Sequence, residues 1–166
     1  GDAVTALTEP LFADEPPAQK RLRLATCMLS DIAAFFHPDL RAAQAFDTAL
    51  RAPFYGVTHK ERVSIALSLF CRHDGRRPGL PDEQALSLLT LDEQQRATRL
   101  GLALRFAGAL APKAPDALAG CALMQAEGKV IFRAPDAVRM LMGEFPRKRL
   151  EALAATYEAA PAEEYY

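Results

Sequence analysis

The sequence predicts a mainly helical domain with one small β-hairpin near its C-terminal end. Two segments begin with a Thr-x-x-Glu motif and continue as almost uniformly apolar runs, Thr58–Cys71 and Thr90–Leu110. Elsewhere, hydrophobic residues recur three and four positions apart, which is the spacing of one helix face. Only residues 121–133 show short apolar runs around a Gly-containing turn, the pattern of a hairpin.

The ends of the chain lack these patterns. Residues 1–15 mix Thr, Glu, Asp and Pro without a period and predict a lead-in or linker. Residues 161–166 predict a frayed tail, which leaves a single helical domain over residues 16–160. Within it, we expect helices at about residues 18–36, 38–52, 58–74, 82–89, 90–110, 136–143 and 147–158.

The helix that follows Thr58 is expected at the centre of the fold, because little of its circumference is polar. Thr58 and Glu61 form a capping box in which a hydroxyl and a carboxylate pair with free backbone amides, and Gly75 marks the end of the helix. In the later apolar helix, Gly101 and Gly108 leave gaps in side-chain bulk that let another backbone approach closely.

The composition excludes some classes of function. Twenty basic and twenty-one acidic residues give a net charge of -1, which does not favour binding to nucleic acid or to a membrane surface. No apolar run is long enough to cross a membrane, and no leader opens the chain. The three cysteines lie among apolar neighbours and predict buried thiols in a reducing compartment. We therefore expect a cytoplasmic protein whose anion site, if present, is local.

Two polar corners are candidate sites. In the first, Arg72, His73 and Asp74 follow the most apolar helix, together with Arg76 and Arg77. Such a cluster could face an anion. The alternative interpretation is a polar helix end, where cations meet the helix dipole favourably. The arginines of this corner also belong to a larger set that could form a basic strip: Arg51, Arg72, Arg76, Arg77, Arg99 and Arg105.

The second corner is His37, Pro38, Asp39 and Arg41. A helix that starts at Pro38 presents free amides to an anion, with Arg41 as a bidentate donor and His37 as a switchable one. The competing interpretation is that Asp39 already occupies this helix start and that Arg41 is solvated.

Five ordered blocks of the sequence resemble one family. They are similar to the C-terminal domain of the exopolyphosphatases and guanosine pentaphosphate phosphohydrolases (Ppx/GppA), in the shorter alphaproteobacterial form, over about residues 20–158. The blocks are Leu29–Ile32, His37–Arg41, Gly56–His59, Ala66–Gly75 and Arg96–Arg105.

The resemblance implies an HD-like helical domain that follows actin-like phosphatase lobes in the parent chain, which hydrolyses polyphosphate or the guanosine nucleotide. The resemblance implies that the catalytic groups lie in those lobes and that Mg²⁺ is their cofactor. Neither a catalytic group nor a cofactor is expected in this domain. What carries over is a role in polyphosphate binding, with His37, Arg41, Arg72 and His73 as lining residues, or in contacts of a homodimer.

Two rival hypotheses remain. A free-standing metal-dependent phosphohydrolase of the HD class would hold its metal with His37, His73 and Asp74, but the full ligand set of that class is absent. A purely structural dimerisation module is the other, motivated by Gly101, Gly108 and the unpaired edges of the hairpin.

Overall fold

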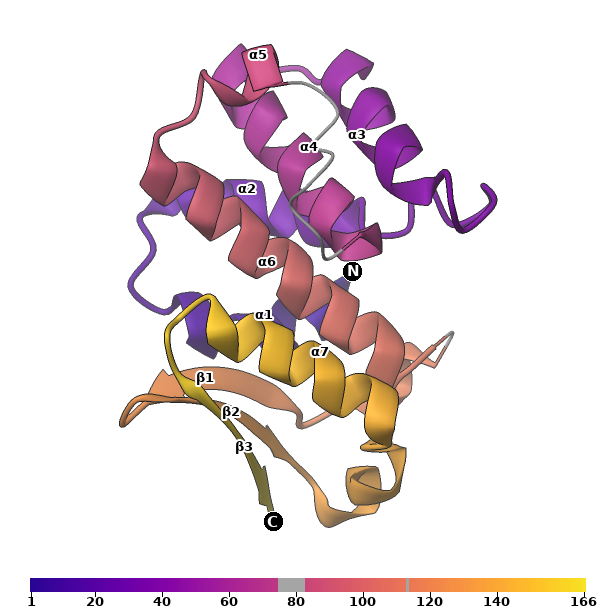
Figure 1. The fold of residues 1–166 in the computed structure, drawn as a ribbon, viewed down its shortest axis with the longest axis vertical. Helices are drawn as coiled ribbons and strands as arrows, with labels where there is room; N and C mark the ends of the chain where they lie inside the picture. The colour runs from indigo at the N-terminus through magenta and orange to yellow at the C-terminus, as the bar shows by residue number, and fades with distance from the viewer. Residues whose placement is uncertain (75–82, 113) are drawn as a thin grey trace.

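The computed structural model describes residues 1–74, 83–112 and 114–166. Figure 1 shows helices stacked above a small sheet. In chain order the elements are α1 (Asp2–Thr8), η1 (Pro10–Phe12), α2 (Pro17–Met28), α3 (Arg41–Arg51), α4 (His59–His73), α5 (Glu83–Leu86), α6 (Leu91–Leu110), η2 (Pro115–Leu118), β1 (Ala122–Ala126), β2 (Lys129–Ala134), η3 (Asp136–Leu141), α7 (Glu144–Ala155) and β3 (Ala160–Tyr165). The predicted mainly helical class is confirmed.

Helix α6 separates two hydrophobic cores. Above it in Figure 1, α3, α4 and α5 enclose one core that includes Phe46 and Leu67. Below it, α1, α7 and the sheet enclose a second core that includes Phe106 and Phe132. We expected α4 at the centre, and α4 is indeed buried, but the longer α6 is the helix that contributes to both cores.

Both predicted capping boxes are present. In α4 the Thr58 hydroxyl accepts from the Glu61 amide and the Glu61 carboxylate accepts from the Thr58 amide. Thr90 and Glu93 repeat the arrangement at the start of α6. Each box satisfies amides that have no partner within the helix. The predicted stop at Gly75 lies outside the described residues, as do Arg76 and Arg77.

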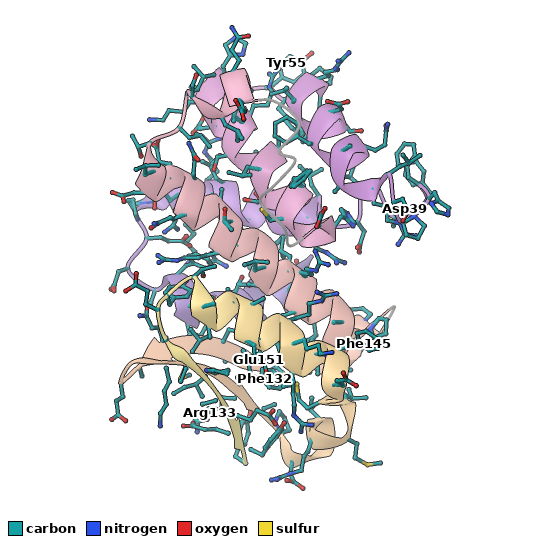
Figure 2. All side chains as sticks on the ribbon, in the orientation of Figure 1. Asp39, Tyr55, Phe132, Arg133, Phe145 and Glu151 are labelled. Carbon is teal, nitrogen blue, oxygen red and sulfur yellow. The ribbon has the colours of Figure 1, made fainter. Side chains whose placement is uncertain are left out.

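The sheet has three strands instead of the predicted two. Strands β1 and β2 form the expected antiparallel hairpin. Its turn residues Glu127 and Gly128 both have positive φ, at 51° and 70°, as a tight two-residue turn requires. Along β2, Phe132 is buried under α7 while Arg133 is exposed on the other face (Figure 2).

The expected frayed tail is wrong, because residues 160–165 form β3. This strand runs parallel to β2, with Ile131 opposite Ala162. The Tyr165 ring packs edge-on against Phe132, with 6.5 Å between ring centroids, and the Tyr166 hydroxyl donates to the Gly120 carbonyl. These contacts join residues far apart in the sequence, so the local pattern of the tail contains no sign of them.

The expected lead-in at residues 1–15 is also wrong. Helix α1 and η1 bring Leu7, Leu11 and Phe12 into the lower core. Glu15 follows them, and its side chain is only 3% exposed because it binds Arg23 of α2. The polar composition of this segment gave no sign that Leu7, Leu11 and Phe12 are buried in a core.

Several helix boundaries differ from the expectation. Helix α2 ends at Met28 instead of continuing to residue 36, and residues 29–36 form successive turns such as Ala34 N to Asp31 O. Ser and Asp favour such turns by offering the backbone alternative partners. The expected helix at 136–143 is the 3₁₀ helix η3. No helix within the described residues has the length and apolarity needed to cross a bilayer.

Candidate functional site

Two neighbouring clefts meet at His73, the last residue of α4. The Arg72 cleft has a volume of about 520 Å³ and is lined by residues that include Asp31, Arg41, Arg72, His73 and Gly108. The Arg105 cleft has a volume of about 540 Å³ and is lined by Pro38, Asp39, Ala42, His73, Asp74, Leu102, Arg105, Arg149 and Ala152. We call Arg41, Arg72, His73, Arg105 and Arg149 the basic cluster.

Arg72 lies in the last turn of α4, and its guanidinium lies beside Gly108 of α6. Its Nη2 is 3.1 Å from Oδ1 of Asp31, and the Arg72 side chain is 19% exposed while that of Asp31 is 74% exposed. Gly108 makes room for the guanidinium, since a Cβ at this position would lie 2.7 Å from Nη1 and Nη2. Burial lowers the pKa of Arg72, and Arg41 lowers it further, while Asp31 opposes both effects.

Arg41 reaches the same cleft from the start of α3. Its Nε donates to the Phe36 carbonyl at 2.8 Å, which fixes the side chain across the preceding turn. The two polar corners that the sequence suggested therefore meet, because Arg41 comes from one and Arg72 and His73 from the other.

His73 is held as a neutral imidazole. Its Nε2 is buried and has no hydrogen-bond partner within the described structure. Burial, followed by the positive charges of Arg72 and Arg41, lowers the pKa of His73 from 6.5 to about 4. Asp31 acts in the opposite direction and Arg105 adds to the depression. An anion in either cleft would offset the positive charge around this side chain.

Arg105 and Arg149 complete the cluster from α6 and α7. Nη1 of Arg105 is buried without an acceptor among the described residues. Burial lowers the pKa of Arg105, and so does Arg149, while Asp74 raises it. Sequence reasoning gave Arg105 only as one member of a basic strip and missed Arg149. Their shared cleft depends on the packing of α6 against α7, for which the sequence has no local signal.

His37 does not join the cluster. Its side chain is 69% exposed, and its nearest charged neighbour is Asp39, with 3.6 Å between Nδ1 and Oδ2. Helix α3 begins at Arg41, so Pro38 does not open a helix and Asp39 does not occupy a helix start. Figure 2 shows Asp39 at the outer edge of the molecule, on the loop before α3. The anion site expected at that helix start is therefore not formed.

The alternative metal set, His37, His73 and Asp74, is not assembled. His73 and Asp74 line the Arg105 cleft, but His37 lines neither cleft. Within the described ranges no group of three His, Cys, Asp or Glu side chains lies close enough to share an ion. The arginines around His73 also disfavour a cation at this position. The chemistry that the basic cluster supports is the recognition of an anion with several oxygens.

The other described arginines of the predicted strip, Arg51 and Arg99, lie elsewhere. Arg99 donates to the Thr156 carbonyl, and its Cζ lies 4.0 Å from the centroid of the Tyr157 ring. Arg51 is exposed in the last turn of α3. The strip is thus divided, and among its described members only Arg72 and Arg105 reach the clefts.

Comparison with known proteins agrees with the resemblance of the five sequence blocks to one family. A search of curated proteins found no match. The family model described as exopolyphosphatase, C-terminal, matches residues 9–159, which is most of the chain. This range extends from the residue before η1 to the residue before β3 and includes the whole basic cluster. The chain therefore belongs to the exopolyphosphatase C-terminal domain family.

Proposed function

We propose that this domain binds inorganic polyphosphate in the basic cluster and presents it to catalytic lobes that precede the domain in a parent exopolyphosphatase. The observation that carries the proposal is the meeting of two clefts at His73, with four arginines along them. Family membership makes the chain the C-terminal part of such an enzyme. The domain itself is then accessory, and hydrolysis takes place on the preceding lobes.

An unpaired donor supports an anionic ligand. Arg105 Nη1 is buried without a partner in the described structure, and leaving a buried donor unpaired costs about 1–3 kcal/mol. Guanidinium groups bind phosphate through two oxygens at once, which suits a chain of phosphate groups passing several arginines.

The lining of the clefts favours a polyphosphate chain over a guanosine nucleotide. No Phe, Tyr or Trp is among the described residues that line either cleft. Proteins commonly bind an unpaired base by stacking it on an aromatic side chain. Two adjoining basic clefts without a Phe, Tyr or Trp platform among their described residues fit a ligand whose repeating unit is phosphate alone.

A titration of the domain with polyphosphate tests the proposal. The double variant Arg41→Ala, Arg72→Ala is expected to bind at least about tenfold more weakly, because a hydrogen bond to a charged group contributes about 1.5–3 kcal/mol. Weaker binding at higher salt is expected as well, since the contacts are ionic. Guanosine triphosphate serves as the comparison ligand and is expected to bind more weakly than polyphosphate.

The matched control removes two positive charges outside the cluster. Arg51 and Lys129 are both exposed and line neither cleft. The variant Arg51→Ala, Lys129→Ala is expected to retain the affinity of the parent domain. If the Arg41→Ala, Arg72→Ala variant bound polyphosphate as tightly as this control, the proposal would be rejected.

The expected homodimer loses two of its sequence arguments. A Cβ at Gly101 would lie 2.3 Å from the Ser68 carbonyl oxygen, and a Cβ at Gly108 would meet Arg72, so both glycines serve contacts within one chain. The β2 edge of the hairpin is covered by β3. We retain dimerisation as a proposal to be tested by light scattering, with and without polyphosphate.

A further inference from the structure

We propose that a cavity between α2, α4 and α6 binds a small carboxylate with an apolar body. This three-helix cavity has a volume of about 100 Å³. It shares no lining residue with the Arg72 cleft or the Arg105 cleft, so the inference does not rest on the proposed function. The lining residues are Phe12, Gln19, Leu22, Arg23, Thr26, Lys60, Glu61, Ser64, Ser68, Leu89, Glu93, Arg96, Ala97 and Leu100.

The walls of the cavity suit a short apolar body. Phe12, Leu22, Leu89 and Leu100 come from four different segments and form much of the lining. A cavity of ~150 Å³ lined by such residues accepts benzene. The three-helix cavity is smaller, so its size fits an aliphatic chain of about four carbons.

Arg23 supplies an unused hydrogen-bond donor. The Arg23 side chain lines the cavity and is 2% exposed. Its Nε donates to Glu15, and its Nη1 donates to the Thr5 carbonyl and the Thr8 hydroxyl. Nη2 is buried and finds no acceptor among the residues that the structure describes. A ligand oxygen that reaches Nη2 would satisfy a donor that is otherwise left unpaired.

The charges around Glu15 leave an excess of one positive charge, shared by the buried Arg23 and by Arg96, which is 31% exposed. Glu15 accepts from Arg23 through Oε1 and from Arg96 through Oε2, so one carboxylate serves two guanidinium groups. Both arginines line the three-helix cavity, whereas Glu15 does not. A carboxylate in the cavity would balance the second guanidinium, which favours an anion over a neutral ligand.

The acidic residues at the rim are already paired. Glu61 accepts from its own capping box and binds Arg21, with 2.6 Å between Oε1 and Nη2. Glu93 likewise belongs to a capping box and binds Lys60 at 2.8 Å. Because these two carboxylates are neutralised, they do not cancel the positive charge of the arginines.

A comparison of three small probes tests the inference on the full chain. Butyrate, butyramide and butanol have similar apolar bodies, but only butyrate carries a negative charge. We expect saturable binding of butyrate, measured by calorimetry and by shifts in the NMR signals of the arginine side chains. Butyrate is expected to bind about tenfold more tightly than either neutral probe, because hydrogen bonds to a charged group are stronger.

A cavity-filling variant locates the site. Ser64 is half-buried on α4 and lines the cavity, so Ser64→Leu places extra bulk in it. This change is expected to weaken butyrate binding by about tenfold. Ser87→Leu, at an exposed position that does not line the cavity, is the matched control and is expected to bind butyrate as the parent does.

The outcomes separate this inference from the proposed function. Polyphosphate affinity is expected to stay the same in Ser64→Leu. Equal affinity for butyrate and butyramide, or no saturable binding of butyrate to the parent domain, would overturn the inference. Unchanged butyrate binding in a correctly folded Ser64→Leu would overturn it too. If Ser64→Leu fails to fold, the preference of the parent domain for butyrate and the shift of the Arg23 signal decide the matter.

Discussion

Helix α6 carries an arginine toward each end, and the two are held in different ways. Near its start, Arg96 shares the buried carboxylate of Glu15 with Arg23. Near its end, Arg105 has Arg149 and Arg72 as positive neighbours, and its Nη1 has no acceptor in the described structure. Among the acids along the clefts, Asp31 and Asp39 have side chains that are 74% and 88% exposed, while Asp74 is half-buried.

This difference separates arginines held by a buried carboxylate from arginines whose charge is open to the ligand that we propose. A buried ion pair is costly to break, because the remaining partner stays buried without compensation. A group of cations that face mainly exposed acids gains little from those pairs, and this charge remains available to a ligand. We therefore expect changes near Glu15 to alter stability, and changes in the basic cluster to alter polyphosphate binding.

The largest effect is expected at Glu15. Glu15→Gln keeps the shape of the side chain but leaves Arg23 buried beside a neutral group. We expect the free energy of unfolding to fall by about 3–5 kcal/mol, measured by urea denaturation. The neighbouring Asp14 is exposed, so Asp14→Asn serves as the control and is expected to leave stability unchanged. Similar stability of the two variants would contradict the structural role assigned to Glu15.

A smaller loss of stability is expected at Gly101, which lies on α6 between Arg96 and Arg105. A Cβ here would lie 2.3 Å from the Ser68 carbonyl oxygen and 2.5 Å from the Cys71 Cβ, so α4 and α6 must separate. Gly101→Ala is expected to lower the free energy of unfolding by about 1–3 kcal/mol. In thermal or urea unfolding, Gly143→Ala provides the control: nothing lies within 4 Å of its added Cβ, so only the loss of glycine at the N-cap of α7 is expected to lower its stability.

The elements near α6 also show what a sequence can predict. The starts of α4 and α6 were predictable because a capping box is complete within four residues. The β1–β2 hairpin was predictable for the same reason, since its turn is local. Strand β3 was not, because its partner β2 lies about thirty residues earlier and supplies the backbone bonds that the tail alone lacks.

The basic cluster was predictable only in part. Arg41, Arg72 and His73 stood out because each belongs to a short polar corner. Arg149 did not, since it sits in an ordinary run of charged residues and reaches the cleft only through the packing of α7 on α6. His37 was wrongly grouped with Arg41, because neighbours in sequence diverge where the backbone turns between Phe36 and Arg41.

A pH effect on binding would sharpen the contrast between the two regions. The pKa of His73 is about 4 in the folded domain and 6.5 in its ordinary state, because burial and the charges of Arg72, Arg41 and Arg105 outweigh Asp31. The folded state therefore binds fewer protons than the unfolded state between these values. The stability that His73 contributes is complete above pH 6.5 and is lost as the pH falls toward 4.

Polyphosphate bound in the basic cluster would reverse this tendency, because its negative charge would raise the pKa of His73 and binding would then take up a proton. We expect polyphosphate affinity to increase severalfold from pH 7 to pH 5. In His73→Gln this increase should be largely lost, whereas His37→Gln should keep it, since His37 lies outside both clefts. Identical pH profiles of His73→Gln and the parent would exclude His73 from the binding site.

The smallest change in stability is expected at Gly108, seven residues after Gly101 on the same helix. Its added Cβ would lie 2.7 Å from Nη1 and Nη2 of Arg72, so a flexible side chain has to move instead of a backbone. The gain in helix propensity, about 1 kcal/mol for Ala over Gly, offsets the cost of displacing Arg72, which is 19% exposed, from Asp31, which is 74% exposed. We expect Gly108→Ala to change the free energy of unfolding by less than about 0.5 kcal/mol while weakening polyphosphate binding severalfold.

Urea denaturation and polyphosphate titration of the same Gly108→Ala sample check both parts. A loss of stability as large as that of Gly101→Ala, or an unchanged affinity, would show that Arg72 is held for the fold and not for the ligand.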